Sequence, residues 1–182
     1  MAVLQKGGTL LYPTDTIWGI GCDATNPAAV EKVYSLKKRT ESKSLIILLD
    51  AIEKIGDYVA VVPDIAWGLV KNTKAPLTII YPQAKNLAPN VIAEDNSIAI
   101  RIVKNEFCIK LIKTFGKPIV STSANISGAP PPADFLHIAP EIIRGVDYSV
   151  DKSLGGSHIS QPSQIIKLEI NGEFKIIRKT IP

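Results

Sequence analysis

The feature that most constrains the fold is a series of short apolar runs separated by segments with helical periodicity. LIILL at 45–49 is apolar at every position, which is typical of a strand covered on both faces. Further runs are PLTIIY at 76–81 and PIVST at 118–122, while IAIRI at 98–102 alternates, with its isoleucines on one face. Strands interleaved with helices in this way predict an α/β domain built on a mixed sheet.

Capping residues mark the expected helix boundaries. Asn26 followed by Pro27 is an N-cap with a first-turn proline, and it predicts a helix that ends near Lys38. Asn105 is expected to cap a helix that stops at Gly116. The apolar spacing predicts further helices at about 51–60, 64–72 and 134–143.

Two connecting segments stand out. Asn171-Gly172 separates QIIKLEI from EFKIIRK, and this pattern predicts a β-hairpin with a type I′ turn. Residues 82–97 form a long polar loop, and such a loop in a compact domain is commonly functional or mobile.

Length and composition predict one domain over residues 1–182. The formal net charge of +4 permits an anionic partner without requiring one. Cys22 and Cys108 lie far apart and outside any CxxC pattern, so we expect reduced thiols in a cytoplasmic protein rather than a disulfide framework or a zinc site. No apolar run approaches the ~18 residues of a membrane span, and no secretory signal is visible, so no membrane association is expected.

The segment LKKRTESKSL at 36–45 concentrates positive charge. Lys37 and Lys38 fall in the last turn of a predicted helix, where cations complement the negative end of the helix dipole. Arg39 and Lys43 lie beyond that helix and directly before the buried strand, a position that lines ligand crevices in α/β proteins. The cluster is therefore either a solvated helix end or a phosphate-binding segment.

Two polar segments each follow a predicted strand. STSANISG at 121–128 is rich in hydroxyl and amide groups, which suits either a connecting loop or a nest for anionic oxygens. In YPTDTIWGIG at 12–21, Thr14 and Thr16 alternate and can present hydroxyls to one ligand, or else they cap the strand end.

Arg101 lies on the alternating strand at 98–102. An arginine there is either at an edge facing water or paired with an anion inside a cleft, and a carboxylate is its natural bidentate partner. Arg178, in the last predicted strand, raises the same question.

PTDTIWGIG, KKRTESKSL and STSANISG occur in this order, and together they closely resemble the YrdC-like family of L-threonylcarbamoyladenylate synthases in its short, single-domain form. The family's lysine–x–arginine and serine–x–asparagine signatures correspond to Lys37-Lys38-Arg39 and Ser123-Ala124-Asn125. The resemblance covers nearly the whole chain. It implies an open twisted α/β sheet with a large basic concave pocket. The chain departs from the family pattern where proline is usual (Thr40, Ser44, Val103), where tyrosine is usual (Trp18) and where a Ser-Thr pair is usual (Gln164).

The resemblance implies ATP, L-threonine and bicarbonate as substrates, with threonylcarbamoyl-AMP and pyrophosphate as products that feed the tRNA threonylcarbamoyl-transfer machinery. By motif, it assigns the ATP phosphates to Lys37, Arg39, Lys43, Ser123, Asn125 and Arg178. It assigns threonine to Thr16, Ser121, Ser163 and Arg101, with Arg101 on the carboxylate. Mg²⁺ would arrive with ATP and keep much of its water, so no protein metal ligand is expected.

The implied reaction brings a carbamate anion to a triphosphate, so it needs fixed cations and hydrogen-bond donors rather than a catalytic nucleophile. The alternative is a paralogue of the same fold that binds double-stranded RNA or tRNA without this activity. Its affinity would fall steeply with salt. The aromatic content of 6% disfavours recognition of single strands by base stacking.

Overall fold

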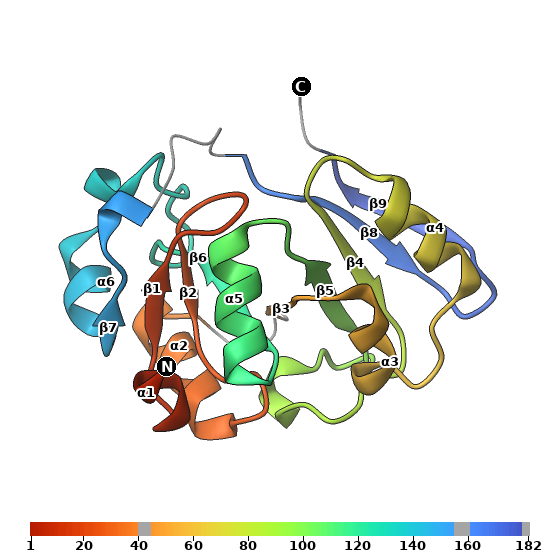
Figure 1. The fold of residues 1–182 in the computed structure, drawn as a ribbon, viewed down its shortest axis with the longest axis horizontal. Helices are drawn as coiled ribbons and strands as arrows, with labels where there is room; N and C mark the ends of the chain where they lie inside the picture. The colour runs from red at the N-terminus through yellow and green to blue at the C-terminus, as the bar shows by residue number, and fades with distance from the viewer. Residues whose placement is uncertain (40–44, 155–160, 180–182) are drawn as a thin grey trace.

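The computed structural model describes residues 1–39, 45–154 and 161–179, and its strands in that part of the chain form one open mixed sheet. The strand order is β7-β1-β2-β6-β3-β5-β4-β8-β9 (Figure 1). The strands are β1 (Leu10–Tyr12), β2 (Gly19–Gly21), β3 (Ile46–Leu49), β4 (Leu77–Tyr81), β5 (Ile98–Ile102), β6 (Ile119–Ser123), β7 (Tyr148–Ser149), β8 (Gln164–Leu168) and β9 (Phe174–Arg178). The predicted α/β class with a mixed sheet is confirmed.

Six α-helices and four short 3₁₀ turns connect these strands in the described part of the chain. The α-helices are α1 (Ala2–Gln5), α2 (Pro27–Lys37), α3 (Ile55–Tyr58), α4 (Asp64–Asn72), α5 (Glu106–Phe115) and α6 (Pro140–Gly145). In Figure 1, α5 crosses the middle of the molecule, α6 lies beside the β1 end and α4 beside β8 and β9. None of these helices combines the length and apolarity that crossing a membrane requires.

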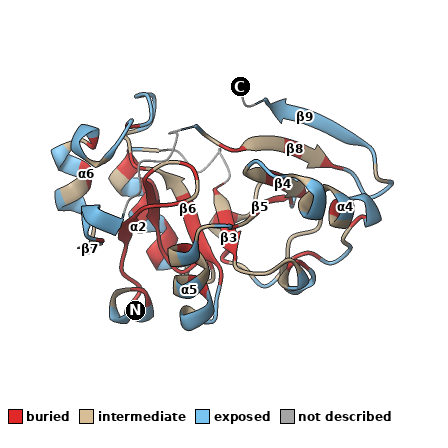
Figure 2. Cartoon of the chain, turned by 45° about the horizontal axis from the view of Figure 1, so that its top comes forward, coloured by how far each residue is buried: buried red, intermediate tan, exposed pale blue. Residues whose placement is uncertain are grey.

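The central strand β3 contributes to a hydrophobic core on each face of the sheet. Ile47 and Leu49 belong to the larger core, which α2 also lines, while Leu48 joins a second core with residues of α5. All three side chains are at most 1% exposed. The strand predicted to be covered on both faces is therefore confirmed, and Figure 2 shows the buried strands at the centre with β9 and α4 more exposed.

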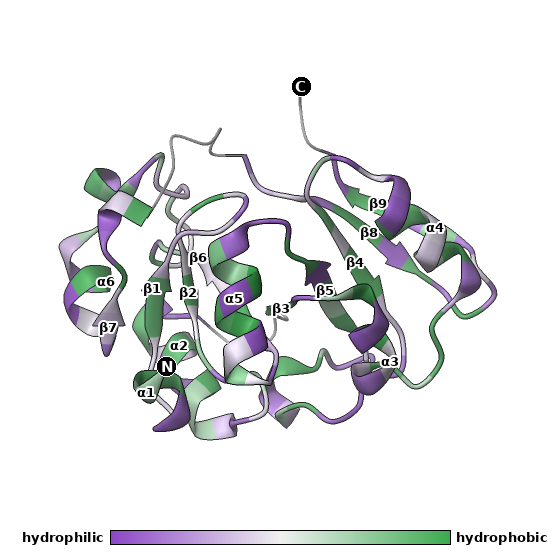
Figure 3. Cartoon of the chain, in the orientation of Figure 1, coloured by the Kyte–Doolittle hydropathy of each residue, from purple (hydrophilic) through white to green (hydrophobic). Residues whose placement is uncertain are grey.

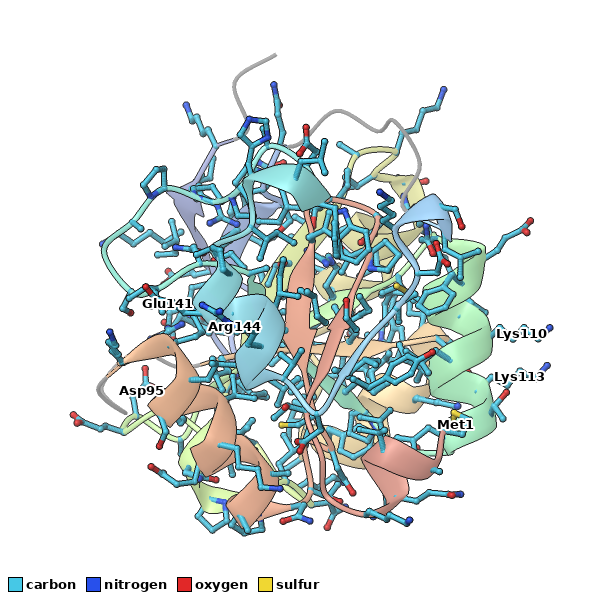
Figure 4. All side chains as sticks on the ribbon, turned by 90° about the vertical axis from the view of Figure 1, so that its left-hand side faces the viewer. Met1, Asp95, Lys110, Lys113, Glu141 and Arg144 are labelled. Carbon is cyan, nitrogen blue, oxygen red and sulfur yellow. The ribbon has the colours of Figure 1, made fainter. Side chains whose placement is uncertain are left out.

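The caps predicted for α2 and α5 are present. The Asn26 side chain accepts hydrogen bonds from the backbone N–H groups of Ala28 and Ala29, and the Asn105 side chain accepts one from Cys108. Along α5, hydrophobic and hydrophilic residues alternate (Figure 3). Lys110 and Lys113 point from this helix into solvent (Figure 4), and the opposite face packs on the sheet.

Two local predictions are wrong. The helix expected at 134–143 is a 3₁₀ turn (Phe135–His137) followed by α6, because Pro140 forces Ala139 into an extended conformation (ψ 134°). The hairpin between β8 and β9 exists, but only Gly172 of the Asn171-Gly172 pair has positive φ, at 86°. A type I′ turn needs positive φ at both positions. Instead the Gly172 N–H donates to the Glu169 carbonyl, which fits a turn closed by a left-handed glycine bulge.

The helical segment after β3 is shorter than predicted, and the loop at 82–97 is more ordered than predicted. The helix expected at 51–60 is a 3₁₀ turn (Ile52–Lys54) running into α3. The 82–97 segment includes the 3₁₀ turn Pro89–Val91 and is anchored to the body of the protein. Its Ala88 N–H donates to the Ala24 carbonyl, and Lys167 bonds the Asp95 carboxylate at 2.7 Å, holding the pKa of Asp95 down at about 2.

Candidate anion-binding site

A cavity of about 400 Å³ lies against one face of the sheet. The strand register explains which side chains line it. Ile46 pairs with Ala99 and Ser121, and Arg101 pairs with Thr78, so these residues share one face of the pleat. The same register continues through Ile80, Ile165 and Arg178 at the other end of the sheet. The alternation predicted for 98–102 is confirmed: Ala99 and Arg101 line the cavity, and the isoleucines face the larger core.

Most of the predicted site residues meet in this cavity although they come from segments far apart in the sequence. Eight of them line it: Thr16, Arg39, Arg101, Ser121, Ser123, Asn125, Ser163 and Arg178. Lys37 is described but is not part of the cavity wall, and Lys43 lies outside the described residues.

The charged side chains among the described lining residues are all arginines: Arg39, Arg101 and Arg178. Burial lowers the pKa of the Arg39 guanidinium. It also lowers that of Arg178, to which the charge of Arg101 adds a smaller effect in the same direction. Three guanidinium groups gathered in a polar cavity favour an anionic ligand, because each offers several N–H donors in a rigid planar fork.

Arg101 is 4% exposed and is paired with Asp15, whose Oδ1 lies 3.1 Å from Nη2 of the arginine. The structure therefore selects the cleft alternative for this arginine over the water-facing one. Asp15 itself does not line the cavity, and both of its carboxylate oxygens are buried. The aspartate thus lies behind Arg101 and compensates its charge, while other donors of the guanidinium remain for a ligand.

Arg178 is held in the cavity wall by Ser163. Its Nε donates to the Ser163 carbonyl at 2.9 Å, and Nη2 lies 3.4 Å from the Ser163 hydroxyl. That hydroxyl is also 2.7 Å from Oγ1 of buried Thr78. The β8–β9 hairpin therefore fixes this arginine through backbone and side-chain contacts.

Thr14 and Thr16 form one hydroxyl pair at the turn after β1. Their Oγ1 atoms are 2.9 Å apart, and the Thr14 hydroxyl donates to the Ile17 carbonyl at 2.7 Å. Thr14 thus serves the turn, and Thr16 is left as the hydroxyl better placed for a ligand. Gly19 continues this wall, and a Cβ there would meet the Ser121 hydroxyl oxygen at 3.3 Å, so its lack of a side chain keeps β2 close to β6.

The turn after β6 carries the Ser123 and Asn125 side chains into the cavity wall. The Asn125 amide nitrogen donates to the Ala129 carbonyl at 2.6 Å, and the Asn125 N–H donates to the Ser123 carbonyl at 2.9 Å. Arg39 reaches the same turn, with Nη1 3.4 Å from the Thr122 hydroxyl. The Asn125 amide nitrogen also donates to the Ile126 carbonyl at 3.0 Å, so its donors serve the turn. The hydroxyls and the guanidinium that converge here are the groups that favour anionic oxygens.

Sequence reasoning missed Asp15 as a site residue. Two features of the sequence could have indicated it. An aspartate lies between the two threonines of PTDT, and an arginine on a buried strand requires a carboxylate partner. Thr78, which bonds Ser163, gave no signal because a threonine inside an apolar strand is ordinary.

The described residues contain no group of three or more His, Cys, Asp or Glu that could hold a metal ion. The described wall supplies hydroxyl and amide oxygens but no carboxylate, imidazole or thiol. Such a wall suits a cation that arrives with a phosphate ligand and keeps its water. It can position and neutralise anions, but among its described members it lacks a residue with a side-chain general base.

Known proteins resemble this chain in sequence over most of its length. A family model for Sua5, YciO and YrdC proteins, described as telomere recombination, matches residues 2–180. A protein of Pseudoalteromonas translucida (strain TAC 125) named threonylcarbamoyl-AMP synthase is 34% identical over 173 residues, covering 93% of this chain and 91% of the relative. One of the same name from Hahella chejuensis (strain KCTC 2396) is 35% identical over 166 residues, covering 91% and 89%.

Solved structures show the same fold. P. abyssi Sua5 complexed with L-threonine superposes with a TM-score of 0.84 at 28% identity over 92% of this chain, and this chain spans 49% of that protein. E. coli YciO superposes with a TM-score of 0.83 at 22% identity, covering 99% of this chain and 86% of YciO. The chain belongs to the Sua5/YciO/YrdC family.

Proposed function

We propose that this protein is a threonylcarbamoyl-AMP synthase, which uses ATP, L-threonine and bicarbonate to supply tRNA threonylcarbamoyladenosine modification. The observation that carries the proposal is the cavity in which three arginines from separate segments face hydroxyl and amide groups. The names of the curated relatives support it, since they match over about nine-tenths of the chain, at 93% and 91%.

In this proposal, Arg101 binds the threonine carboxylate. Oδ1 of Asp15 lies 3.1 Å from Nη2 of this guanidinium and compensates its charge. The hydroxyls of Thr16, Ser121 and Ser163 belong to the same wall and would bind the remaining polar groups of threonine. Aliphatic side chains of Ile46, Ile80 and Ile165 lie among them and suit the threonine methyl group.

The ATP phosphates would occupy the part of the cavity lined by Arg39, Ser123 and Asn125, with Arg178 from the β8–β9 hairpin. Lys43 stays a prediction for the same role. Mg²⁺ would be carried by the phosphates, because the described wall offers it only hydroxyl and amide oxygens.

In the proposed reaction, bicarbonate loses hydroxide to give carbon dioxide, and the lone pair of the threonine amine forms a bond to its carbon. The proton that the amine loses combines with the hydroxide as water, which leaves an N-carboxylate. An oxygen of this carboxylate then forms a bond to the α-phosphorus, the bond from that phosphorus to the bridging oxygen breaks, and pyrophosphate leaves. Both partners are anions, so the contribution of the arginines is to hold them together and to neutralise charge that develops in the transition state.

The proposal also includes the setting of the reaction. The protein acts in the cytoplasm as one domain over residues 1–182, and its product passes to tRNA threonylcarbamoyl-transfer machinery. Direct contact with tRNA or double-stranded RNA stays a prediction.

The test is pyrophosphate release from ATP, Mg²⁺ and bicarbonate with and without L-threonine. We expect release that depends on threonine and is largely lost with L-serine or L-alanine, because the wall provides contacts for both the hydroxyl and the methyl group. Release that is absent or independent of threonine in folded protein would contradict the synthase assignment.

Two variants test the threonine and ATP assignments separately. Arg101→Gln should raise the threonine KM at least about tenfold and the ATP KM much less, since a lost charged contact costs about 1.5–3 kcal/mol. Arg39→Ala should reverse this order, and the exposed neighbour Lys38→Ala should change neither. Equal effects of the two arginine variants on both substrates would contradict these two assignments.

A further inference from the structure

Lys37 is buried at the end of α2, although lysine is the residue that most easily reaches water from a helix end. The residue is 2% exposed, whereas the side chain of the next residue, Lys38, is 72% exposed. A buried ammonium is stable only when hydrogen bonds replace its hydration. The hydrogen bonds of the Lys37 ammonium therefore indicate the role of this residue.

The Lys37 ammonium binds the backbone of the turn after β6. Its Nζ donates to the Ser123 carbonyl at 2.5 Å and to the Asn125 carbonyl at 2.6 Å. The backbone of Lys37 adds a third bond, since its carbonyl accepts from the Ser127 N–H at 2.9 Å. One residue of α2 thus fixes three points of a turn that lies 86 or more positions further along the chain.

The chain geometry separates Lys37 from Arg39. Lys38, between them, caps α2 in the left-handed conformation with φ 51°. After this cap, Arg39 lies in the cavity wall, and Lys37 does not. Arg39 therefore lines the cavity near the Ser123–Asn125 turn, whereas Lys37 contacts the backbone of this turn without lining the cavity.

The carbonyl groups that Lys37 holds belong to residues whose side chains line the cavity. A carbonyl oxygen carries partial negative charge, so a turn that receives an anion works best when its carbonyls are directed elsewhere. An ammonium has three donors, and two of those of Lys37 are engaged by these carbonyls. If the ammonium moved to a phosphate, the Asn125 carbonyl would lose this bond and the Ser123 carbonyl would keep only the bond from the Asn125 N–H, which is unfavourable.

We propose that Lys37 is a positioning residue for the anion site, which holds the Ser123–Asn125 turn from behind while Arg39 contacts the ligand. The part that concerns ATP rests on the proposed function. It reassigns Lys37, which the family resemblance placed among the phosphate ligands. Burial, and to a lesser degree the charge of Arg39, lower the pKa of Lys37 to about 8, as expected for an ammonium enclosed by protein.

The first experiment uses the protein without nucleotide. Amide hydrogen exchange is compared in wild type, Lys37→Met, Arg39→Met and Lys38→Met. Lys37→Met should speed exchange at Asn125 and Ser127 about tenfold or more, because their turn loses its anchor. Arg39→Met and Lys38→Met should leave these amides within about twofold of wild type. Unchanged exchange in Lys37→Met would overturn the proposal.

The second experiment measures ATP affinity at several NaCl concentrations. Removing a cation that touches phosphate weakens binding and flattens its salt dependence, because one charge pair subject to screening is lost. Arg39→Met should weaken ATP binding and flatten its salt dependence. Lys37→Met should weaken binding and keep the wild-type slope. A flattened slope in Lys37→Met would identify Lys37 as a phosphate ligand and overturn the proposal.

A third measurement does not depend on the folding of a variant. In wild-type protein titrated with ATP, the side-chain nitrogen NMR signal of Arg39 should shift strongly, and that of Lys37 should shift much less. Equal shifts would overturn the proposal. Absence of ATP binding to wild type would instead contradict the proposed function, and the exchange experiment would still decide whether Lys37 anchors the turn.

Discussion

At the scale of single residues, the site depends on pairs in which one member meets the ligand and the other holds it in place. Asp15 lies behind Arg101, Ser163 holds Arg178, and Lys37 holds the turn that carries Ser123 and Asn125. In the two arginine pairs the supporting contact leaves donors of the guanidinium for a ligand. Such support fixes a guanidinium or a hydroxyl more closely than an exposed side chain could.

A prediction at this scale concerns Asp15. Asp15→Asn keeps the shape of the side chain and removes the charge that faces buried Arg101. Because this leaves an uncompensated buried cation, we expect the free energy of unfolding to fall by about 3 kcal/mol. We also expect the threonine Kd to rise at least about tenfold, with ATP affinity changed by less than about twofold.

Calorimetric titration with each substrate and urea denaturation measure these effects. Asp64→Asn, an exposed charge change in the first turn of α4, is the control and should alter neither substrate. Equal losses of threonine and ATP affinity in Asp15→Asn would show that Asp15 acts on the whole fold rather than on Arg101.

At the scale of elements, β2 packs against β1 and β6 with no room for a side chain at Gly21. A Cβ added at Gly21 would lie 2.5 Å from the Val120 carbonyl oxygen and 2.7 Å from Cε1 of Tyr12. Both distances are far inside van der Waals contact, and the first involves backbone that cannot easily move. Gly21 is therefore required by packing and not by a special backbone angle.

The prediction for this element is that Gly21→Ala lowers the free energy of unfolding by about 1–3 kcal/mol or more, because it overpacks the sheet. Gly68→Ala is the matched control. Gly68 lies inside α4 with nothing within 4 Å of an added Cβ, so alanine there should stabilise by about 0.5–1 kcal/mol. Urea denaturation of both variants measures the difference, and two changes of the same sign would contradict it.

Two elements show how far local sequence patterns determine the structure. The departure from the family pattern at Val103 is compatible with the sheet, since its N–H donates to the Leu49 carbonyl at 3.0 Å, a bond that proline could not make. The turn between β8 and β9 was mispredicted because dipeptide composition does not determine how many residues the two strands leave unpaired.

At the scale of the whole molecule, several acidic protons are buried in the two cores. Burial raises the pKa of Cys108 to about 12, with a smaller contribution from Asp15, and it also raises the pKa values of Cys22 and Tyr12. The unfolded chain loses these protons at lower pH than the folded protein does. Between pH 9 and 12 the folded state therefore binds more protons, and stability falls as pH rises.

We predict that urea denaturation shows this loss above pH 9, and that Cys108→Ser reduces the slope by up to about 1.4 kcal/mol per pH unit. Serine keeps a donor for the Pro13 carbonyl, which Cys108 contacts at 3.3 Å, but it does not titrate in this range. Lys37 opposes the trend, since its lowered pKa lets the unfolded chain hold more protons above pH 8. An unchanged slope in Cys108→Ser would contradict the prediction.

The sequence by itself determined the mixed α/β class, the strands other than β2 and β7, the caps of α2 and α5 and the set of polar residues that carries the family signatures. These features follow from periodicity and from short motifs, because each depends on neighbours within a few residues. The alternation in 98–102 was enough to place Ala99 and Arg101 on one face.

Only the tertiary structure decided which residue holds each cavity-lining residue in place. Asp15 and Arg101, or Lys37 and Asn125, are 86 or more positions apart, and no local pattern specifies a contact across that separation. The difference between Lys37 and Arg39 depends on the left-handed turn at Lys38 and on where the carbonyls of a distant turn lie. Burial then determines the result, because a charge removed from water binds whichever partner the fold brings to it.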